Sequence, residues 1–568
     1  MPSAPATRSF EATERRHFRR PAERPFLVHE RSSVTVLFGG LTLAHERLIG
    51  AVLQRSGYRA ERVPTPDLGG YHLGRYFGNV GQCNPAYFNV GALIQYLRQL
   101  EAGGLSRREI VDRYVFLTAG ACGPCRFGMY EAEYRFALQN AGFDGFRVLV
   151  FNQADGVKAA TGEPGLKFSV HLGLGILNAL VAADVLNDLA FRIRPFEKDP
   201  GQTDHAIDAA VGHLAARMQH RTLFELQDRA PAWLVRGLSC APRLQSTVNV
   251  LAKVHDHLQG PQTREAWQAC RDRIGGIEVD WLRVRPVVKI AGEFWAQTTE
   301  GDGNFRMFSF LEREGAEVHV EPVSTWLAFL LWYAKESHVR RHRLAPARPP
   351  ARRIRARLSY EWQFRRKRAL LKLGERLLAR HYRRVSAALG DLGDELPDLD
   401  EFGDLARGFY DPLLGGGEGH LEVAKLLHCS RHGTAHLLLS LKPFGCMPST
   451  QSDGVQSAVL SRCPDALFLP VETSGDGAIH AYSRVQMALG EARVRAQAEF
   501  DRALTQTGRS LGEIRSFVEG HPEWRRPFIS IPRRPGIAGT AANVVRHVGD
   551  LIRAAGSVAP VPAEMPRR

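Results

Sequence analysis

The fold is decided by residues 114–130, whose sequence is YVFLTAGACGPCRFGMY. Residues 114–118 form an apolar run of β-branched and aromatic side chains, which predicts a buried strand. The run breaks at Gly120, and a helical pattern begins just after Cys125. A strand that leads directly into a helix is the repeating unit of α/β proteins. This stretch therefore predicts a sheet with helices packed against it.

The same alternation continues through both halves of the chain. Strands are expected at residues 34–38, 58–63, 114–118 and 146–151, and again at 287–291, 316–320, 436–441 and 467–471. Helical patterns lie between them, among others at 42–55, 87–100, 126–140 and 304–314. Strands and helices alternating at this spacing favour parallel sheets. We predict an α/β protein with two Rossmann-like (flavodoxin-like) parallel-sheet domains and a helical insert or connector.

The expected domain boundaries follow from this alternation. The segments, in order, are a disordered basic leader (1–30), a first α/β domain (31–165), a mainly helical connector (166–283), a second α/β domain (284–505) with a basic helical insert (338–384), and a helical C-terminal extension and tail (506–568). Two stretches are expected to be loops, namely the glycine-rich one before Cys83 and the acidic one at 390–404.

The composition is that of a soluble globular protein, with 44% hydrophobic and 24% charged residues. Eight cysteines in 568 residues are too few for a disulfide framework, so a reducing compartment is expected. Residues 1–25 contain no apolar core segment, so no secretory signal is expected. Polar side chains such as Asp184 interrupt the longest apolar stretch, 172–189, which favours a buried helix over a membrane span. We predict a cytoplasmic protein.

The net charge of +15 is concentrated in one segment. Residues 340–384 contain seventeen Lys and Arg against only Glu361 and Glu375, so the rest of the chain is close to neutral. The simplest interpretation is the solvated face of an amphipathic helix, and the alternative is docking to an acidic partner or a phosphate-bearing ligand. No nucleic-acid-binding motif accompanies the segment, so no specific DNA or RNA binding is expected.

Four cysteines are the candidate functional residues. Cys122, Cys125 and Cys446 each follow the end of an expected strand, and Cys83 lies in a loop on the same side of its domain. Ligands of open α/β sheets bind beyond the carboxyl ends of the strands. Thiols at such positions in both domains are what a shared cofactor between the domains would require.

Cys122 and Cys125 alone allow two kinds of chemistry. A Cys-x-x-Cys pair at the start of a helix can cycle between dithiol and disulfide, or it can ligate a metal or an iron–sulfur cluster. No Trp precedes Cys122, and the surrounding pattern fits a doubly wound sheet better than a thioredoxin fold. Ligation is therefore favoured, while a redox pair and a purely structural pair stay open. The other cysteines, 240, 270, 429 and 463, are expected to be core or surface thiols.

Other motifs carry less weight. His428, His432 and His436 suggest a metal site, but no glutamate accompanies them at the spacing of zinc proteases, so structural histidines are expected. The sequence has no Walker phosphate loop, dinucleotide fingerprint or Gly-x-Ser-x-Gly elbow. The chain is not expected to hydrolyse ATP itself.

Taken together, the cysteine segments resemble those of the 2-hydroxyacyl-CoA dehydratase and acyl-CoA dehydratase activase-related iron–sulfur proteins. The segments that carry the resemblance are GQCNP at 81–85, LTAGACGPCRFGMY at 117–130, Gly292-Glu293, and KPFGCMPS at 442–449. The similar regions are roughly residues 33–155 and 284–500.

The resemblance implies a low-potential [4Fe–4S] cluster held by Cys83, Cys122, Cys125 and Cys446 between two α/β domains. It implies a separate ATP-dependent activase of actin-like fold as the partner that delivers one electron. The electron would pass by way of the cluster to the thioester carbonyl of a 2-hydroxyacyl-CoA-like substrate, and the resulting ketyl radical would expel the hydroxyl. The implied enzyme is a dehydratase-like lyase, with a homodimer as one oligomeric alternative.

Two departures from the family leave the function open. No ATPase half is fused to this chain, and the dehydratases are two-subunit enzymes of shorter chains. An electron-transfer or cluster-scaffold protein without its own substrate is the alternative, and a thiol–disulfide oxidoreductase using Cys122 and Cys125 is the second. No catalytic acid or base is assigned; the candidates for proton handling at strand or loop ends are Glu293, Glu418, Glu472 and Asp476.

Overall fold

The computed structural model describes residues 23–120, 123, 125–152, 165–226, 231, 233, 236, 240–344 and 354–557. Cys122, most of the expected leader and the end of the expected C-terminal tail lie outside the described residues.

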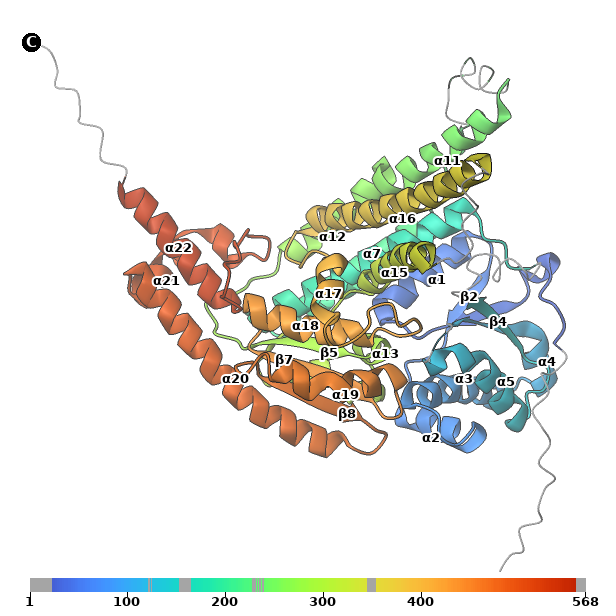
Figure 1. Ribbon diagram of the computed structural model, residues 1–568, viewed down its shortest axis with the longest axis horizontal. Coiled ribbons are helices and arrows are strands. Elements are labelled where there is room, and N and C mark those ends of the chain that lie inside the picture. The colour runs from blue at the N-terminus through green and yellow to red at the C-terminus, as the bar shows by residue number, and fades with distance from the viewer. Residues whose placement is uncertain are drawn as a thin grey trace, which may run out of the picture.

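The first domain is a parallel sheet of four strands with helices on both faces (Figure 1). The strands are β1 (Thr35–Phe38), β2 (Arg59–Arg62), β3 (Tyr114–Gly120) and β4 (Arg147–Asn152), in the order β2-β1-β3-β4. Successive side chains of a strand point to opposite faces. Val36 accordingly packs towards α1 (Leu43–Arg55), and Leu37 packs towards the face covered by α3 (Asn84–Ala102) and α5 (Tyr130–Asn140).

The second domain repeats this architecture. Its strands are β5 (Val287–Gly292), β6 (Glu317–His319), β7 (Leu437–Pro443) and β8 (Phe468–Thr473), in the order β6-β5-β7-β8, all parallel. Both sheets thus follow the 2-1-3-4 order of a doubly wound, flavodoxin-like fold. The predicted fold class is confirmed.

The remaining helices complete the two domains and the C-terminal part. In the first domain there is also α4 (Arg107–Arg113). The second domain contains α13 (Phe294–Thr298), α14 (Met307–Arg313), α18 (Gly419–His432), α19 (Met447–Leu460) and α20 (Ala478–Thr507). The chain continues through α21 (Leu511–Gly520) and α22 (Thr540–Ser557), which lie beside α20 (Figure 1).

A helical part joins the domains, as the sequence predicts. Its central helix α7 (Val170–Ile193) contacts α1, α8 (Gln202–Gln219) and α11 (Pro242–Gln259), and α8 packs on α12 (Pro261–Gly275). Among the described residues, the stretch Val170–Phe196 is the one candidate membrane span by length and composition, with a mean hydropathy of 1.5. Because 56% of its apolar window is buried inside the protein, it is a core helix.

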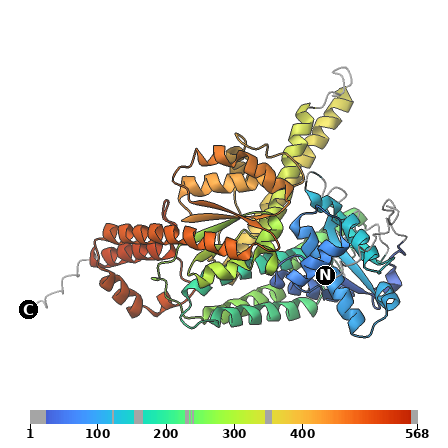
Figure 2. The same ribbon diagram turned by 90° about the horizontal axis from the view of Figure 1, so that it is seen from below.

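The basic insert forms a long helical arm. α15 (Val323–Leu344) packs against α16 (Ile354–Leu389), and Figure 2 shows their far end projecting from the body. Near that end, α16 exposes apolar side chains as well as arginines, with Leu358 64% and Trp362 60% exposed. The projecting helix therefore combines positive charge with uncovered apolar surface.

Two stretches predicted to be loops are helical in part, and these predictions were wrong. The glycine-rich stretch before Cys83 contains α2 (Leu68–Phe77), and the acidic stretch contains α17 (Leu399–Ala406). The glycines of α2 permit close helix packing, since a Cβ on Gly74 would lie 2.0 Å from the carbonyl oxygen of Tyr87 on α3. α17 begins at Asp398, whose carboxylate accepts hydrogen bonds from the first-turn amides.

One buried carboxylate connects the helical part to both domains. Asp184, on α7, is 1% exposed and lies 3.1 Å from Nε2 of His45 on α1. It also accepts hydrogen bonds from the backbone amides of Val323 and Ser324 at the start of α15, at 2.7 and 2.8 Å. The first amides of a helix have no partner within the helix. Asp184 therefore caps α15 from a distant part of the chain.

We expect Asp184→Ala to destabilise the protein by roughly 3 kcal/mol, because it leaves buried donors on two helices without an acceptor. Hydrogen exchange should accelerate at the amides of Val323 and Ser324. The matched control is Asp398→Ala, which removes a local, exposed cap and should lower stability by only about 1 kcal/mol. Equal shifts of the thermal midpoint in the two variants would contradict the linking role of Asp184.

Candidate functional site

The carboxyl ends of the two sheets face each other, and the loops that follow them meet. In a 2-1-3-4 sheet the chain changes direction between the first and third strands, and this is where ligands bind. In the first domain β3 runs into the loop of Cys122 and Cys125. In the second domain β5 ends before Glu293 and β7 ends before Cys446.

The loop of Cys125 packs against a glycine loop of the second domain. The amide of Cys125 donates to the carbonyl of Gly416 at 2.9 Å. Gly123 has φ +136°, and a Cβ placed there would lie 2.4 Å from Cα of Gly416 and 2.5 Å from O of Gly415. Only glycine accommodates both the backbone angle and the close approach.

The loop of Cys83 packs against the loop of Cys446 in the same way. The amide of Asn84 donates to the carbonyl of Phe444 at 3.0 Å, and its side chain donates to the carbonyl of Thr473 at 2.6 Å. A Cβ on Gly445 would lie 3.2 Å from Cα of Cys83. The structure thus brings Cys83, Cys125 and Cys446 to one place where the loops of the two domains meet, which is called the cysteine cleft below, while Cys122 lies outside the described residues.

Each of the three thiols precedes the first turn of a helix. Cys83 is the N-cap of α3, Cys446 that of α19, and Cys125 that of the short 3-10 helix Arg126–Met129. Proline in the first turn of α3 and α19 fits the start of a helix. The Cys83 Sγ also lies 3.3 Å from the hydroxyl of Tyr130.

The surroundings keep these thiols protonated in the metal-free protein. Burial raises the pKa of Cys83, and the pKa values of Cys446 and Cys125 also rise, the latter to about 12. Glu293 adds to the shift at all three thiols, and Glu418 adds to it at Cys125 and Cys446. A raised pKa disfavours a reactive thiolate at Cys125. A bound metal would supply the positive charge that favours the thiolate.

Two carboxylates of the second domain line the cleft. Glu293 accepts a hydrogen bond from the amide of Ala296 at 2.9 Å, and Glu418 accepts one from the amide of Phe294 at 2.9 Å. Burial, followed by the charge of Glu418, raises the pKa of Glu293 to about 8. The pKa of Glu418 is also raised, chiefly by burial. Glu293 can therefore hold a proton near neutral pH.

Of the four acidic candidates, the structure brings only Glu293 and Glu418 to the cleft. Glu472 and Asp476 are exposed. Tyr130 is a cleft residue that the sequence did not single out, although it ends the stretch on which the fold prediction rests. Its hydroxyl is buried beside Cys83, and burial raises its pKa well above the usual value.

The residues present fit an iron–sulfur cluster in donor type. Buried thiols from both domains are the ligands that such clusters take. The described cysteines do not form a set with all donor atoms within 4.8 Å of one another, the spacing of donors around a single ion. Thiolates of a cluster each bind a different iron and are spaced more widely.

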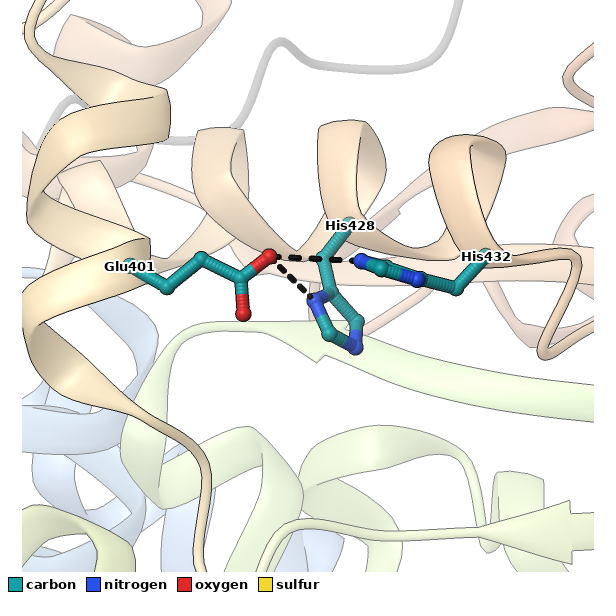
Figure 3. Close-up of side chains that lie close together, drawn as sticks. All are labelled: Glu401, His428 and His432. Carbon is teal, nitrogen blue, oxygen red and sulfur yellow. Dashed lines mark hydrogen bonds and ion pairs between the residues drawn. The ribbon is translucent and has the colours of Figure 1, made fainter. Parts of the chain in front are cut away.

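Among the described residues, one set of three side chains does meet the single-ion spacing. Figure 3 shows Glu401 of α17 pointing toward His428 and His432 of α18, with its Oε1 3.3 Å from Nδ1 of His428 and from Nε2 of His432. The structural role expected of these histidines stays a prediction, because the same three side chains have the spacing that a single metal ion needs. His436, the third of the series, instead accepts a hydrogen bond from the amide of Val287 at 2.9 Å.

Comparison with models of known protein families finds no match for this chain, and comparison with curated proteins finds none either.

We expect Gly123→Ala to separate the two loops and to lower stability by about 1–3 kcal/mol beyond the backbone strain, because the new methyl group would overlap Gly416. Alkylation of Cys125 should become faster as the loops part. Gly81→Ala is the control, since Gly81 also has positive φ but has nothing within 4 Å of its Cβ position. If Gly81→Ala exposes Cys125 equally, the packing of Gly123 on Gly416 is not what closes the cleft.

In the metal-free protein, Glu293 should make stability fall as the pH rises. Its folded pKa of about 8 exceeds an unfolded value near ~4.3, so between these pH values the folded state holds a proton that the unfolded chain releases. The stabilisation that protonated Glu293 contributes is fully present below about pH 4 and is lost as the pH rises to about 8. Glu293→Gln should make the thermal midpoint depend less on pH between pH 5 and 8. Glu472→Gln, which changes an exposed carboxylate, should leave that dependence unchanged. A profile unchanged by Glu293→Gln would refute the assignment.

Proposed function

We propose that the protein is the iron–sulfur component of an ATP-activated acyl-CoA dehydratase or reductase-type system. Cys83, Cys122, Cys125 and Cys446 would hold a [4Fe–4S] cluster in the interdomain cleft. When bound, such a cluster carries one electron at low potential. The substrate would be a 2-hydroxyacyl-CoA-like thioester, and the enzyme a lyase.

One observation carries the proposal: the loops of Cys83, Cys125 and Cys446 meet where the carboxyl ends of two doubly wound sheets face each other. These cysteines are far apart in the sequence and come from both domains. Cys83 and Cys446 are buried, Cys125 is half-buried, and all three are free thiols, the donors that an iron–sulfur cluster takes. The acyl-CoA part of the proposal rests on the family resemblance of the cysteine segments.

The chain's own groups would serve this function in distinct ways. The helix starts at Cys83 and Cys446 present backbone N–H groups beside sulfur, which tune a cluster's potential. Tyr130 would donate a hydrogen bond to the Cys83 thiolate. Glu293 would hold and deliver a proton at the cleft, because its pKa of about 8 keeps a proton available near neutral pH, and Glu418, whose pKa is also raised, lies beside it.

Two alternatives use the same residues. An electron-transfer or cluster-scaffold protein would need the four cysteines but no substrate. A thiol–disulfide oxidoreductase would need only Cys122 and Cys125, and the raised pKa of Cys125 speaks against it. In the proposed system the activase is a separate ATP-dependent protein of actin-like fold, the compartment is the cytoplasm, and a homodimer is one form the chain could take.

Anaerobic purification tests the cluster. We expect a brown protein with about four irons and four sulfides per chain or per dimer, and Cys83→Ser and Cys446→Ser should bleach it. Cys240→Ser, which changes an exposed thiol in the helical part, should leave colour and iron content unchanged. A colourless, iron-free protein made with adequate iron, or bleaching by Cys240→Ser, would contradict the proposal.

A second measurement separates the enzyme from the electron carrier. The paramagnetic spectrum of the reduced protein should change when a 2-hydroxyacyl-CoA is added. Glu293→Gln should retain the iron and this response but lose turnover with a matched activase. An iron-containing protein whose spectrum responds to no 2-hydroxyacyl-CoA would favour the electron carrier.

A further inference from the structure

A cavity lies in the helical part, away from the cysteine cleft. Its volume is about 320 Å³, in the range of small-molecule sites. The end of α1, the start of α7, the end of α8 and the junction of α11 with α12 enclose it. Arg55, Ser56 and Tyr58 on its wall precede β2, so it lies towards the amino ends of the strands. The cysteines follow the carboxyl ends, and the cavity is therefore a separate site.

The lining contains cations and no carboxylate. The cationic side chains are those of Arg31, Arg55, Lys167, Arg217 and Arg221. Arg217 pairs with Glu265, and Arg221 pairs with Asp256, behind the wall. Within the part of the chain that the structure describes, Arg31, Arg55 and Lys167 have no carboxylate partner. The cavity thus carries uncompensated positive charge.

Arg31 and Arg55 each use one N–H group of the guanidinium to bind a backbone carbonyl. Nε of Arg31 donates to the carbonyl of Gly165, and Nε of Arg55 donates to the carbonyl of Arg221, both at 2.5 Å. Nη2 of Arg31 is buried and has no hydrogen-bond partner among the described residues. Oδ1 of Asn178, also on the wall, is likewise buried without a hydrogen-bond partner among the described residues. Buried polar groups are normally satisfied, so the free donor of Arg31 suits an anion, whereas Oδ1 of Asn178 is an acceptor that only a donor such as water would satisfy.

The rest of the wall is apolar. Val52, Leu214 and Trp267 are 6%, 1% and 5% exposed, and Met218 adds a flexible apolar side chain beside them. A ligand that satisfies both parts of the wall needs a negative group at one end and a hydrocarbon body at the other. Lys167 is exposed, so the negative group would lie at the mouth and the body inside.

The geometry points to a binding site for an amphiphilic organic anion, with its carboxylate or phosphate at Arg31, Arg55 and Lys167 and its apolar body against Leu214, Met218 and Trp267. The site is independent of the cysteine cleft. Its ligand is a small molecule and does not depend on a cluster being present.

Calorimetry on the full chain tests the charge requirement, with octanoate, octyl phosphate and octan-1-ol as probes below their aggregation limits. One anion should bind at one site per chain at least tenfold more tightly than the alcohol. Tighter binding of octanoate assigns a carboxylic acid, and tighter binding of octyl phosphate assigns a phosphate ester. Equal binding of the alcohol and both anions, or binding of none, would overturn the proposal.

Variants locate the site. Lys167→Met and the double variant Arg55→Met/Lys167→Met should weaken anion binding at least tenfold, while Lys372→Met/Arg376→Met on α16 removes the same charge elsewhere and should change nothing. If the double variant does not fold, binding to the single variant Lys167→Met serves as the test. Quenching of Trp fluorescence by 8-bromooctanoate should shrink in Trp267→Phe. Undiminished quenching, or equal loss of binding in the α16 control, would place the ligand elsewhere and refute the site.

Discussion

The arrangement of the molecule depends on the carboxylate of Asp184. Each α/β domain has its own sheet and its own core, and the domains touch directly at the cysteine loops and at the contact of Phe88 with Trp295. Asp184 lies on α7 between them, contacts His45 of the first domain and caps the first turn of α15 in the second. A nearby buried arginine strengthens the same junction, because Arg192 of α7 reaches Glu317 and His319 of β6. Two charged side chains on one apolar helix thus contact both domains, in addition to the apolar packing of α7 on α1 and β6.

The cleft is a consequence of that junction. Once the carboxyl edges of the sheets are held face to face, the loops after β3 and β7 must meet loops of the opposite domain, and glycines at 123 and 445 permit contact between backbones. The contact buries thiols beside two carboxylates, and this raises the pKa of every one of these groups. Such a site is poorly suited to a free thiolate and well suited to a cation held by thiolates. Burial also lets Glu293 hold a proton near neutral pH, which an exposed carboxylate would not do.

The sequence predicts the two sheets well because buried parallel strands are short apolar runs with clear ends. It also predicts that Cys125 and Cys446 lie at the carboxyl edges of their sheets, because each follows a strand, but the meeting of the two edges comes from tertiary packing. It fails at α2 and α17, where glycine or acidic composition suggests a loop but packing on α3 and capping by Asp398 stabilise a helix. Local patterns do not encode Glu401 beside His428, or the cationic cavity, because both arise from helices that tertiary packing brings together.

The helical arm gives the molecule a lopsided electric field. α16 has 36 residues, which at 1.5 Å per residue is about 54 Å of helix. Nearly all the excess positive charge of the protein lies on this arm and its approach, while the body is close to neutral. At low ionic strength such a distribution orients the whole molecule before contact, so an acidic surface would be met by the tip first. At physiological salt this guidance acts only within a Debye length of about 8 Å, and at contact the uncovered Leu358 and Trp362 add apolar surface. Charge would govern the approach, and apolar contact would govern how long the encounter lasts.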